Sequence, residues 1–135
     1  VLQKTGVDGV VLFNTFPGAK IRDLEWKKGM EPSLEKVTED GALGGLSGRK
    51  LYENVFKGVE WIKENYPEMK IIASGGVDHG YKAYDLMKAG ADAVQCYSVV
   101  AFRYMAPHKI LNEFQEKLES EGYASLEEFL KARGK

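Results

Sequence analysis

The sequence predicts a chain of the α/β class, in which parallel strands alternate with helices. Apolar runs such as residues 70–74 are short, end in small or hydroxyl-bearing residues, and are followed by a helical pattern. In addition, residues 6–10 and 90–94 are near copies, in which a helix-ending glycine stands two residues before an aspartate and an apolar strand. Units of strand and helix in series produce such a weak internal repeat.

The first predicted strand, residues 9–14, is uniformly apolar, which is typical of a parallel strand that is buried on both faces. It follows residues 1–6, which have the pattern of a helix end closed by a glycine. Residues 15–48 then form a long polar segment, punctuated by glycine and proline, in which only 19–28 are compatible with a small hairpin. A long irregular segment inside a compact domain is usually functional.

Helices and strands alternate along the rest of the chain. Residues 51–66 predict an amphipathic helix whose apolar face consists of Leu51, Val55, Val59 and Ile62. The next helix is expected at 78–88, with Asp78 as its N-cap and Gly90 as its C-cap. The remaining predicted elements are strands at 70–74 and 93–97, a short helical segment after Ser98, a helix at 107–121 with Ile110, Phe114 and Leu118 facing inward, and a terminal helix opened by a capping box of Ser125 and Glu128.

Three parallel strands alone leave two open sheet edges, so we expect the chain to be part of a larger structure. A complete (β/α)8 TIM barrel needs about 250 residues, whereas this chain has 135. We therefore expect residues 1–135 to be the C-terminal fragment of one such barrel domain, with about three βα units. The N-terminal half of the barrel is then missing from the chain.

Composition excludes several classes of function. The net charge of −1, with 29% charged residues, suggests neither a nucleic-acid partner nor a membrane surface, and no apolar run is long enough for a membrane segment. The single cysteine, Cys96, excludes an internal disulfide framework and fits a reducing, cytoplasmic location. Its strand neighbours favour a core thiol over a nucleophile. His79 and His108 have no paired ligand in the sequence, so no metal site is expected.

Small residues that follow two neighbouring strands predict a phosphate site. Gly75 and Gly76 stand between a buried strand and a helix, where backbone N–H groups approach an anion at the helix N-terminus. A tight turn without a ligand is the alternative for this pair. Tyr97 and Ser98 occupy the matching place after the next strand, and two adjacent units of this kind form the usual phosphate site of a TIM barrel. The convergence of the two segments favours phosphate binding.

Two further segments are predicted to contact a ligand. The glycine-rich loop 44–48 leads directly into the apolar face of a helix, which indicates a fixed junction rather than a flexible linker. Asn14 and Thr15 supply an amide and a hydroxyl group at the end of the first strand, in a place suited to hydrogen bonds with a polar heterocycle. Capping of the strand end is the alternative role of Asn14.

These motifs resemble the C-terminal part of dihydroorotate dehydrogenases, in order and in spacing, along essentially the whole chain. The motifs are Asn14-Thr15, Gly44-Gly-Leu-Ser-Gly48, Gly75-Gly76 and Val94-Gln-Cys-Tyr-Ser98. The Gly-Gly-Leu-Ser-Gly box is fairly specific to that family and to its relative, the FMN domain of dihydropyrimidine dehydrogenase. A Gly-Gly pair followed by a phosphate-binding strand end is shared more widely among FMN barrels.

The resemblance implies an FMN-dependent barrel enzyme that oxidises dihydroorotate to orotate in pyrimidine biosynthesis, with hydride passing to the flavin while a base takes a proton. It implies that Ser47 and Gly48 contact the flavin, that Gly75, Gly76, Tyr97 and Ser98 hold its phosphate, and that Asn14 and Thr15 bind the substrate. It also places the catalytic base and a flavin-contacting lysine upstream of Val1. We therefore assign no catalytic residue to this chain, and the electron acceptor stays open.

The chain departs from the family pattern in three places. Many members have a small or hydroxyl-bearing residue in place of Phe13, threonine is commoner in place of Ser98, and residues 16–41 are a long insert. Two alternatives to this enzyme stay open. One is a non-enzymatic half-barrel that binds a phosphate or nucleotide and folds alone or by self-association, in which case two copies could cover each other's open strand edges as a homodimer. The other is a related FMN dehydrogenase that acts on a dihydropyrimidine.

Overall fold

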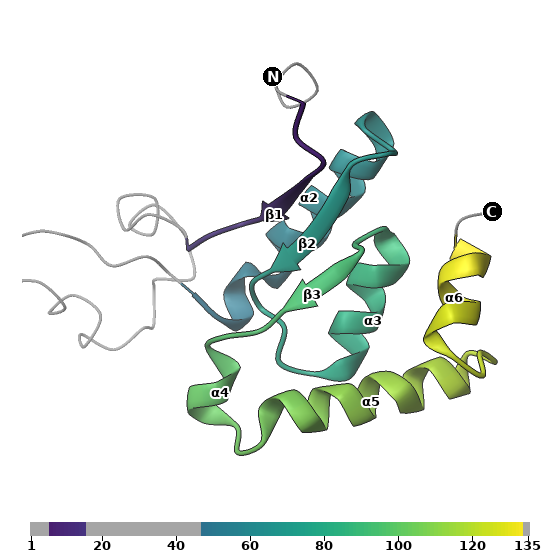
Figure 1. The fold of residues 1–135 in the computed structure, drawn as a ribbon. Helices are drawn as coiled ribbons and strands as arrows, with labels where there is room; N and C mark the ends of the chain where they lie inside the picture. Colours follow the sequence, from purple (N-terminus) through teal and green to yellow (C-terminus); the bar gives the residue numbers. More distant parts are fainter. Residues whose placement is uncertain (1–5, 16–46, 134–135) are drawn as a thin grey trace, which may run out of the picture.

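The computed structural model describes residues 6–15 and 47–133. Its centre is a three-stranded parallel sheet in the order β1-β2-β3, with a helix between successive strands (Figure 1). The elements are β1 (Gly9–Leu12), the 3-10 turn η4 (Arg49–Leu51), α2 (Tyr52–Asn65), β2 (Lys70–Ser74), α3 (Gly80–Ala89), β3 (Ala93–Gln95), α4 (Val99–Phe102), α5 (Ala106–Ser120) and α6 (Leu126–Arg133). The predicted α/β class with parallel strands is confirmed. The expectations for residues 1–5, 16–46 and the hairpin at 19–28 lie outside the described residues.

One face of the sheet carries the core. Ile71 and Ala73 of β2 are fully buried, and the parallel register places Val10 and Leu12 of β1 beside them. Helices α2 and α3 pack against the strands on this side. The prediction that the first strand is buried on both faces is wrong for the described residues, because Val11 is 60% exposed. Three strands do not close on themselves, so the opposite face of β1 is open to solvent within the described part of the chain.

The helix predicted at 51–66 is confirmed as the turn η4 followed directly by α2. Its apolar face is buried as the spacing predicts, and the buried residues are Leu51, Val55, Val59 and Ile62. Gly58 lets the end of β1 approach this helix closely. A Cβ atom on Gly58 would lie 2.5 Å from Cε2 of Phe13.

Helix α3 begins at Gly80, and the expectation that Asp78 is its N-cap is wrong. The N-cap position belongs to His79, whose side chain makes no capping hydrogen bond. The carboxylate of Asp78 pairs with the cationic side chains of Arg49 and Lys82 instead, because hydrogen bonds to charged groups are stronger than one to a backbone N–H group. Gly90 ends the helix as predicted, with a φ of 125° and its N–H bonded to the backbone oxygen of Met87.

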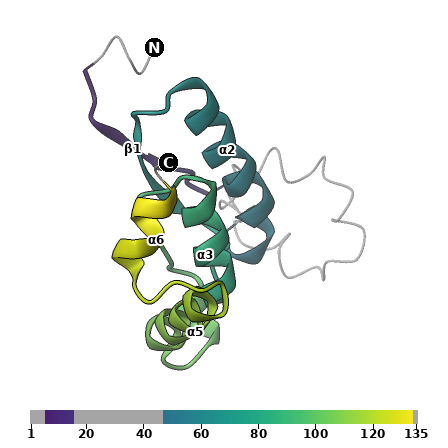
Figure 2. The same cartoon turned by 90° about the vertical axis from the view of Figure 1, so that its right-hand side faces the viewer.

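The last third of the chain packs on α3. In Figure 2, α3 lies between α2 on one side and α6 on the other, with α5 across its end. The strand predicted at 93–97 ends at Gln95, whereas α5 keeps its predicted inward residues Ile110, Phe114 and Leu118 buried. The predicted capping box forms in modified shape: the N–H of Glu128 donates to Ser125 Oγ at 3.2 Å, while the Glu128 carboxylate accepts from the N–H of Ala124 at 2.8 Å.

A charged cluster closes the amino-terminal edge of the sheet. Oδ2 of Asp92 accepts a hydrogen bond of 2.9 Å from the N–H of Ile71. The same carboxylate pairs with Lys70 at 3.3 Å and with Lys63 and Arg133 at 3.7 Å. Arg133 also donates to two backbone oxygens at the end of α3, which ties the terminal helix to the domain. This cluster lies at the opposite ends of the strands from the residues described next.

Candidate functional site

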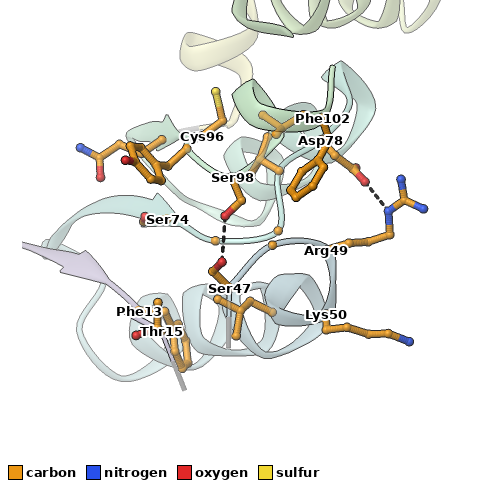
Figure 3. Close-up of a pocket in the computed structure, with 18 of the residues that line it drawn as sticks. Phe13, Thr15, Ser47, Arg49, Lys50, Ser74, Asp78, Cys96, Ser98 and Phe102 are labelled. Atoms are coloured by element: carbon orange, nitrogen blue, oxygen red, sulfur yellow. Dashed lines mark hydrogen bonds and ion pairs between the residues drawn. The ribbon is translucent and has the colours of Figure 1, made fainter. Parts of the chain in front are cut away.

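A cavity of about 890 Å³ lies at the carboxyl ends of the strands. Its wall consists of the residues that follow β1, β2 and β3, together with the segment that leads into α2 (Figure 3). The cavity is bordered by every residue that the sequence analysis assigned to a ligand: Asn14, Thr15, Ser47, Gly48, Gly75, Gly76, Tyr97 and Ser98. Parallel strands bring their carboxyl ends to one edge of a sheet, and this edge is where ligands of α/β proteins bind.

The turn after β2 depends on its two glycines. Gly75 has a φ of 118° and Gly76 a φ of 78°, which side chains rarely adopt. A Cβ atom on Gly76 would lie 2.5 Å from the backbone nitrogen of Tyr52 at the start of α2. Among the described residues, the N–H groups of Gly76 and Val77 donate no hydrogen bond to another backbone group. The turn is therefore tight for packing reasons, and it also leaves N–H groups suited to an anionic ligand at the cavity wall.

The loops before α2 and after β3 meet at two serines. The hydroxyl of Ser98 donates to Ser47 Oγ at 3.1 Å (Figure 3). Gly48, with a φ of 82°, lies beside this pair, and a Cβ atom there would be 3.8 Å from Cβ of Ser98. Tyr97 is 91% exposed, so its ring is not part of the packed wall. The structure thus brings two hydroxyl groups together and leaves the Tyr97 ring in solvent.

The end of β1 reaches the cavity through a residue with left-handed backbone. β1 ends at Leu12, and Phe13 has a φ of 68°, which is rare for a residue with a bulky side chain. The N–H of Thr15 donates to Oδ1 of Asn14 at 2.7 Å. This contact is local to two neighbouring residues, so strand-end capping and substrate binding both stay predictions for Asn14. Both Asn14 and Thr15 lie exposed at the rim of the cavity.

Asp78 forms the centre of a charged cluster that the sequence analysis missed. Its carboxylate is 12% exposed, with Nε of Arg49 at 2.6 Å, Nζ of Lys82 at 2.8 Å and Nδ1 of His79 at 3.0 Å. Burial acts to raise the pKa of the Asp78 carboxyl, but hydrogen bonds from these three side chains outweigh burial and hold its pKa well below the usual range. The spacing of Asp78 and Lys82, four positions apart across the start of the predicted helix, was the available signal.

Arg103, which follows α4, connects the same loop to α5. Its Nη1 donates to the backbone oxygen of Asp78 at 2.8 Å, and its Nη2 pairs with Glu113. Oε2 of Glu113 accepts a hydrogen bond of 2.8 Å from the N–H of Gly80, so a side chain of α5 caps the first turn of α3. The N-terminus of α3 is therefore partly occupied by a protein carboxylate. An anion at this site would depend more on the glycine turn than the sequence analysis expected.

Cys96 borders the cavity and is partly buried against the hydrophobic core, in agreement with its prediction as a packed thiol. His79 contacts Asp78, and Nε2 of His108 lies 3.3 Å from the side-chain nitrogen of Asn112. In residues 6–15 and 47–133, no group of three or more potential metal ligands comes together.

Comparison with known proteins gives a consistent set of relatives. A family model described as dihydroorotate dehydrogenase matches residues 1–118. Dihydroorotate dehydrogenase (quinone) of Dichelobacter nodosus is 33% identical over 103 residues, which are 73% of this chain and 26% of the relative. The catalytic subunit of dihydroorotate dehydrogenase B (NAD(+)) from Thermotoga maritima is 36% identical over 93 residues, which are 69% of this chain and 29% of the relative.

The fold has solved counterparts as well. Ligand-free DHODH from Eimeria tenella superposes with a TM-score of 0.73 at 30% identity, and the match covers 90% of this chain and 31% of that chain. The chain thus spans less than a third of the length of each of these three proteins. None of the helices in the described ranges combines the length and the apolar character that crossing a membrane requires.

Proposed function

The chain belongs to the dihydroorotate dehydrogenase family, and from this premise we propose that it supplies the C-terminal βα units of an FMN-dependent barrel that oxidises dihydroorotate to orotate. Its three parallel strands and its structural similarity to a solved member of the family fit part of a (β/α)8 barrel. The remainder of the barrel is then the partner that the complete activity requires. We include the cytoplasmic location in this proposal, on the basis of the single cysteine.

The observation that carries the proposal is the convergence of three separate loops on one cavity. Residues after β2 and β3 lie on the same wall, and the Ser47–Ser98 hydrogen bond joins that wall to the loop before α2. In TIM barrels, a phosphate site is frequently built from the loops that follow the last two strands. The relative positions of the loops after β2 and β3 support that assignment.

The residues at the cavity are chemically suited to FMN. A volume of about 890 Å³ falls in the range of small-molecule sites. The turn at Gly75 and Gly76 presents backbone N–H groups, Ser98 a hydroxyl group and Arg49 a nearby positive charge, which together suit a phosphate monoester. When bound, FMN supplies the capacity to accept a hydride from the substrate.

We assign the residues of this chain to binding and orientation. Ser47 and Gly48 would contact the flavin, and Gly75, Gly76, Tyr97 and Ser98 would hold its phosphate. Because the Tyr97 ring is in solvent, the backbone of Tyr97 is the part suited to this role. Asn14 and Thr15, at the rim, would hydrogen-bond the substrate, with the amide oxygen of Asn14 already engaged by Thr15.

A second candidate function is supported by the open face of the sheet. Val11 is 60% exposed on a strand that lies at the edge of the described sheet. A half-barrel that binds a phosphate or nucleotide without catalysis could cover this face in a homodimer. A monomer in light scattering, together with cooperative thermal unfolding, would argue against the dimeric form of this second function.

Binding of FMN to the purified chain, with riboflavin as the matched ligand, tests the proposal. The two compounds differ by the phosphate, so a phosphate site predicts that only FMN is retained through desalting, as seen in the visible absorption spectrum. Orotate should then perturb the flavin bands. Equal retention of both compounds, or of neither, would contradict the proposed phosphate site. A spectrum that responds to a dihydropyrimidine but not to orotate would favour the related dehydrogenase.

A further inference from the structure

Asp78 connects the three loops that build the cavity. Its carboxylate accepts from Arg49, which directly follows Gly48, with a distance of 2.6 Å (Figure 3). Its backbone oxygen accepts from Arg103, in the segment after β3, at 2.8 Å. Asp78 itself belongs to the turn after β2. One residue therefore links the loop before α2, the turn at 75–76 and the segment that follows Ser98.

The two ends of this connection differ in exposure. The Asp78 side chain is 12% exposed and forms an ion pair with Lys82, whose side chain is 11% exposed. The Arg49 side chain is 74% exposed and approaches Asp78 with Nε. Asp78 is therefore the fixed partner, because its anchor is buried, while Arg49 is the side chain that is held in place.

Asp78 could affect an anionic ligand in two ways: its charge would weaken binding, whereas its hold on the loops would strengthen binding. A carboxylate at a phosphate site repels the phosphate, although Arg49 and Lys82 leave the cluster with a positive balance. Replacing the carboxylate by an amide of the same shape would strengthen phosphate binding if charge alone mattered. The same replacement would weaken binding if the carboxylate acts by holding the loops. The two roles therefore differ in the sign of the effect.

We propose that Asp78 is a positioning residue of the cofactor site, which holds the segment 47–49 and the turn 75–76 in a fixed relation so that both face one phosphate-bearing ligand. This inference rests on the proposed function. It requires no contact between Asp78 and the ligand. It concerns the placement of backbone groups, which lose binding strength steeply when they move by a fraction of an ångström.

The chain offers a matched control at the other end of the sheet. Asp92 is also a partly buried carboxylate with several cationic partners, including Lys70 at 3.3 Å and Arg133 at 3.7 Å. It lies before β3, whereas the cavity lies after it. Asp92→Asn therefore removes a comparable set of ion pairs without touching the loops of the site.

The test compares the full chain with Asp78→Asn, Arg49→Gln and Asp92→Asn. FMN and riboflavin affinities are measured by flavin fluorescence, and amide hydrogen exchange is followed by mass spectrometry in peptides that contain residues 47–51. Positioning predicts FMN binding that is weaker by about tenfold in Asp78→Asn, weaker binding in the milder variant Arg49→Gln, and faster exchange at 47–51 in both. Asp92→Asn should keep the wild-type affinity and the wild-type exchange at 47–51.

Each arm of the test has its own contrary result. FMN affinity in Asp78→Asn that equals or exceeds that of the wild type would overturn the positioning role. If the wild-type chain does not distinguish FMN from riboflavin, the proposed function fails, and hydrogen exchange alone decides the inference. In that case unchanged exchange at 47–51 in Arg49→Gln overturns positioning, whereas faster exchange there, absent from Asp92→Asn, upholds it.

Discussion

The hydroxyl groups of Ser47 and Ser98, 51 positions apart in the chain, share a hydrogen bond of 3.1 Å at the wall of the cavity. A hydrogen bond of this kind near the surface contributes little net stability, because water competes for both groups. Each hydroxyl group keeps further capacity to accept a hydrogen bond. The pair is therefore better suited to organising a ligand than to holding the fold.

Replacing Ser98 by alanine should affect the ligand more than the fold. We expect FMN binding weaker by about three- to tenfold and a free energy of unfolding changed by less than about 1 kcal/mol, measured by fluorescence titration and urea denaturation. Ser120→Ala is the control, because its hydroxyl bonds only a nearby backbone oxygen of α5. An unchanged FMN affinity in Ser98→Ala would remove this residue from the proposed phosphate site.

Gly76→Ala should destabilise the domain strongly. The new Cβ atom would lie 2.5 Å from backbone of α2, at a φ of 78°. Strain and overpacking together predict a loss of about 2 to 4 kcal/mol in the free energy of unfolding. Gly122→Ala isolates the backbone term, because its φ of 88° is similar and no atom lies within 4 Å of the new group. That variant should lose only about 1 kcal/mol in urea denaturation; equal losses in both would show that the contact with α2 is unimportant.

Stability should fall in acid partly because of Asp78. Its pKa is lower in the folded chain than in the unfolded chain, so the unfolded state takes up a proton first as the pH falls. The stabilisation is therefore complete above the ordinary carboxyl range and is lost progressively from about pH 5 downwards. Asp78→Asn should flatten this decline in urea midpoints measured between about pH 5 and pH 3. Glu127→Gln, at an exposed pair with Lys131, should leave the slope unchanged; a wild-type slope in Asp78→Asn would contradict the prediction.

Gly58→Ala should separate stability from substrate binding. Alanine favours a helix interior by about 0.5 to 1 kcal/mol over glycine, but the Cβ atom would meet the ring of Phe13 at 2.5 Å. We expect a nearly unchanged free energy of unfolding and a displaced Phe13, which shifts Asn14 and Thr15. The response of the FMN spectrum to orotate should then need more orotate. Adding Phe13→Leu to Gly58→Ala should restore the wild-type response to orotate. A wild-type response in Gly58→Ala alone would show that the contact between residues 58 and 13 does not place Asn14 and Thr15.

Periodicity and short motifs were sufficient for most of the fold and for the location of the site. The apolar residues of α2 recur at helical spacing, so Val55 and Val59 could be placed inside without knowing their partners. Asn14, Thr15, Gly75, Gly76, Tyr97 and Ser98 could be placed because they follow strands, and the carboxyl ends of parallel strands meet at one edge. Ser47 and Gly48 lead into α2 instead and were placed from their glycine-rich motif. Both inferences depend on local order along the chain.

The failures concern choices between distant partners. Asp78 has the residue type and position of an N-cap, but Arg49 and Lys82 reach its carboxylate, while the N–H of Gly80 is bonded by Glu113, 33 positions away. The spacing of Lys82, four positions after Asp78, is a local signal. Local sequence contains no information about Arg49, 29 positions from Asp78, or about Glu113. The burial of Val11 was misjudged for a related reason, because an apolar strand shows that a face is suited to burial, not that a neighbour is present.

The charged clusters around Asp78 and Asp92 lie at opposite ends of the strands, so the two ends of the sheet should differ in their tolerance to sequence change. Randomising positions 13–15 and 96–98 in a library should yield mostly folded variants with altered ligand preference, since the contacts of Asp92 hold the amino-terminal ends of β2 and β3 independently. Randomising 69–73 and 91–92 should yield mostly aggregated chains. Such a separation would let substrate choice diverge between descendants of one ancestral barrel while the scaffold is kept.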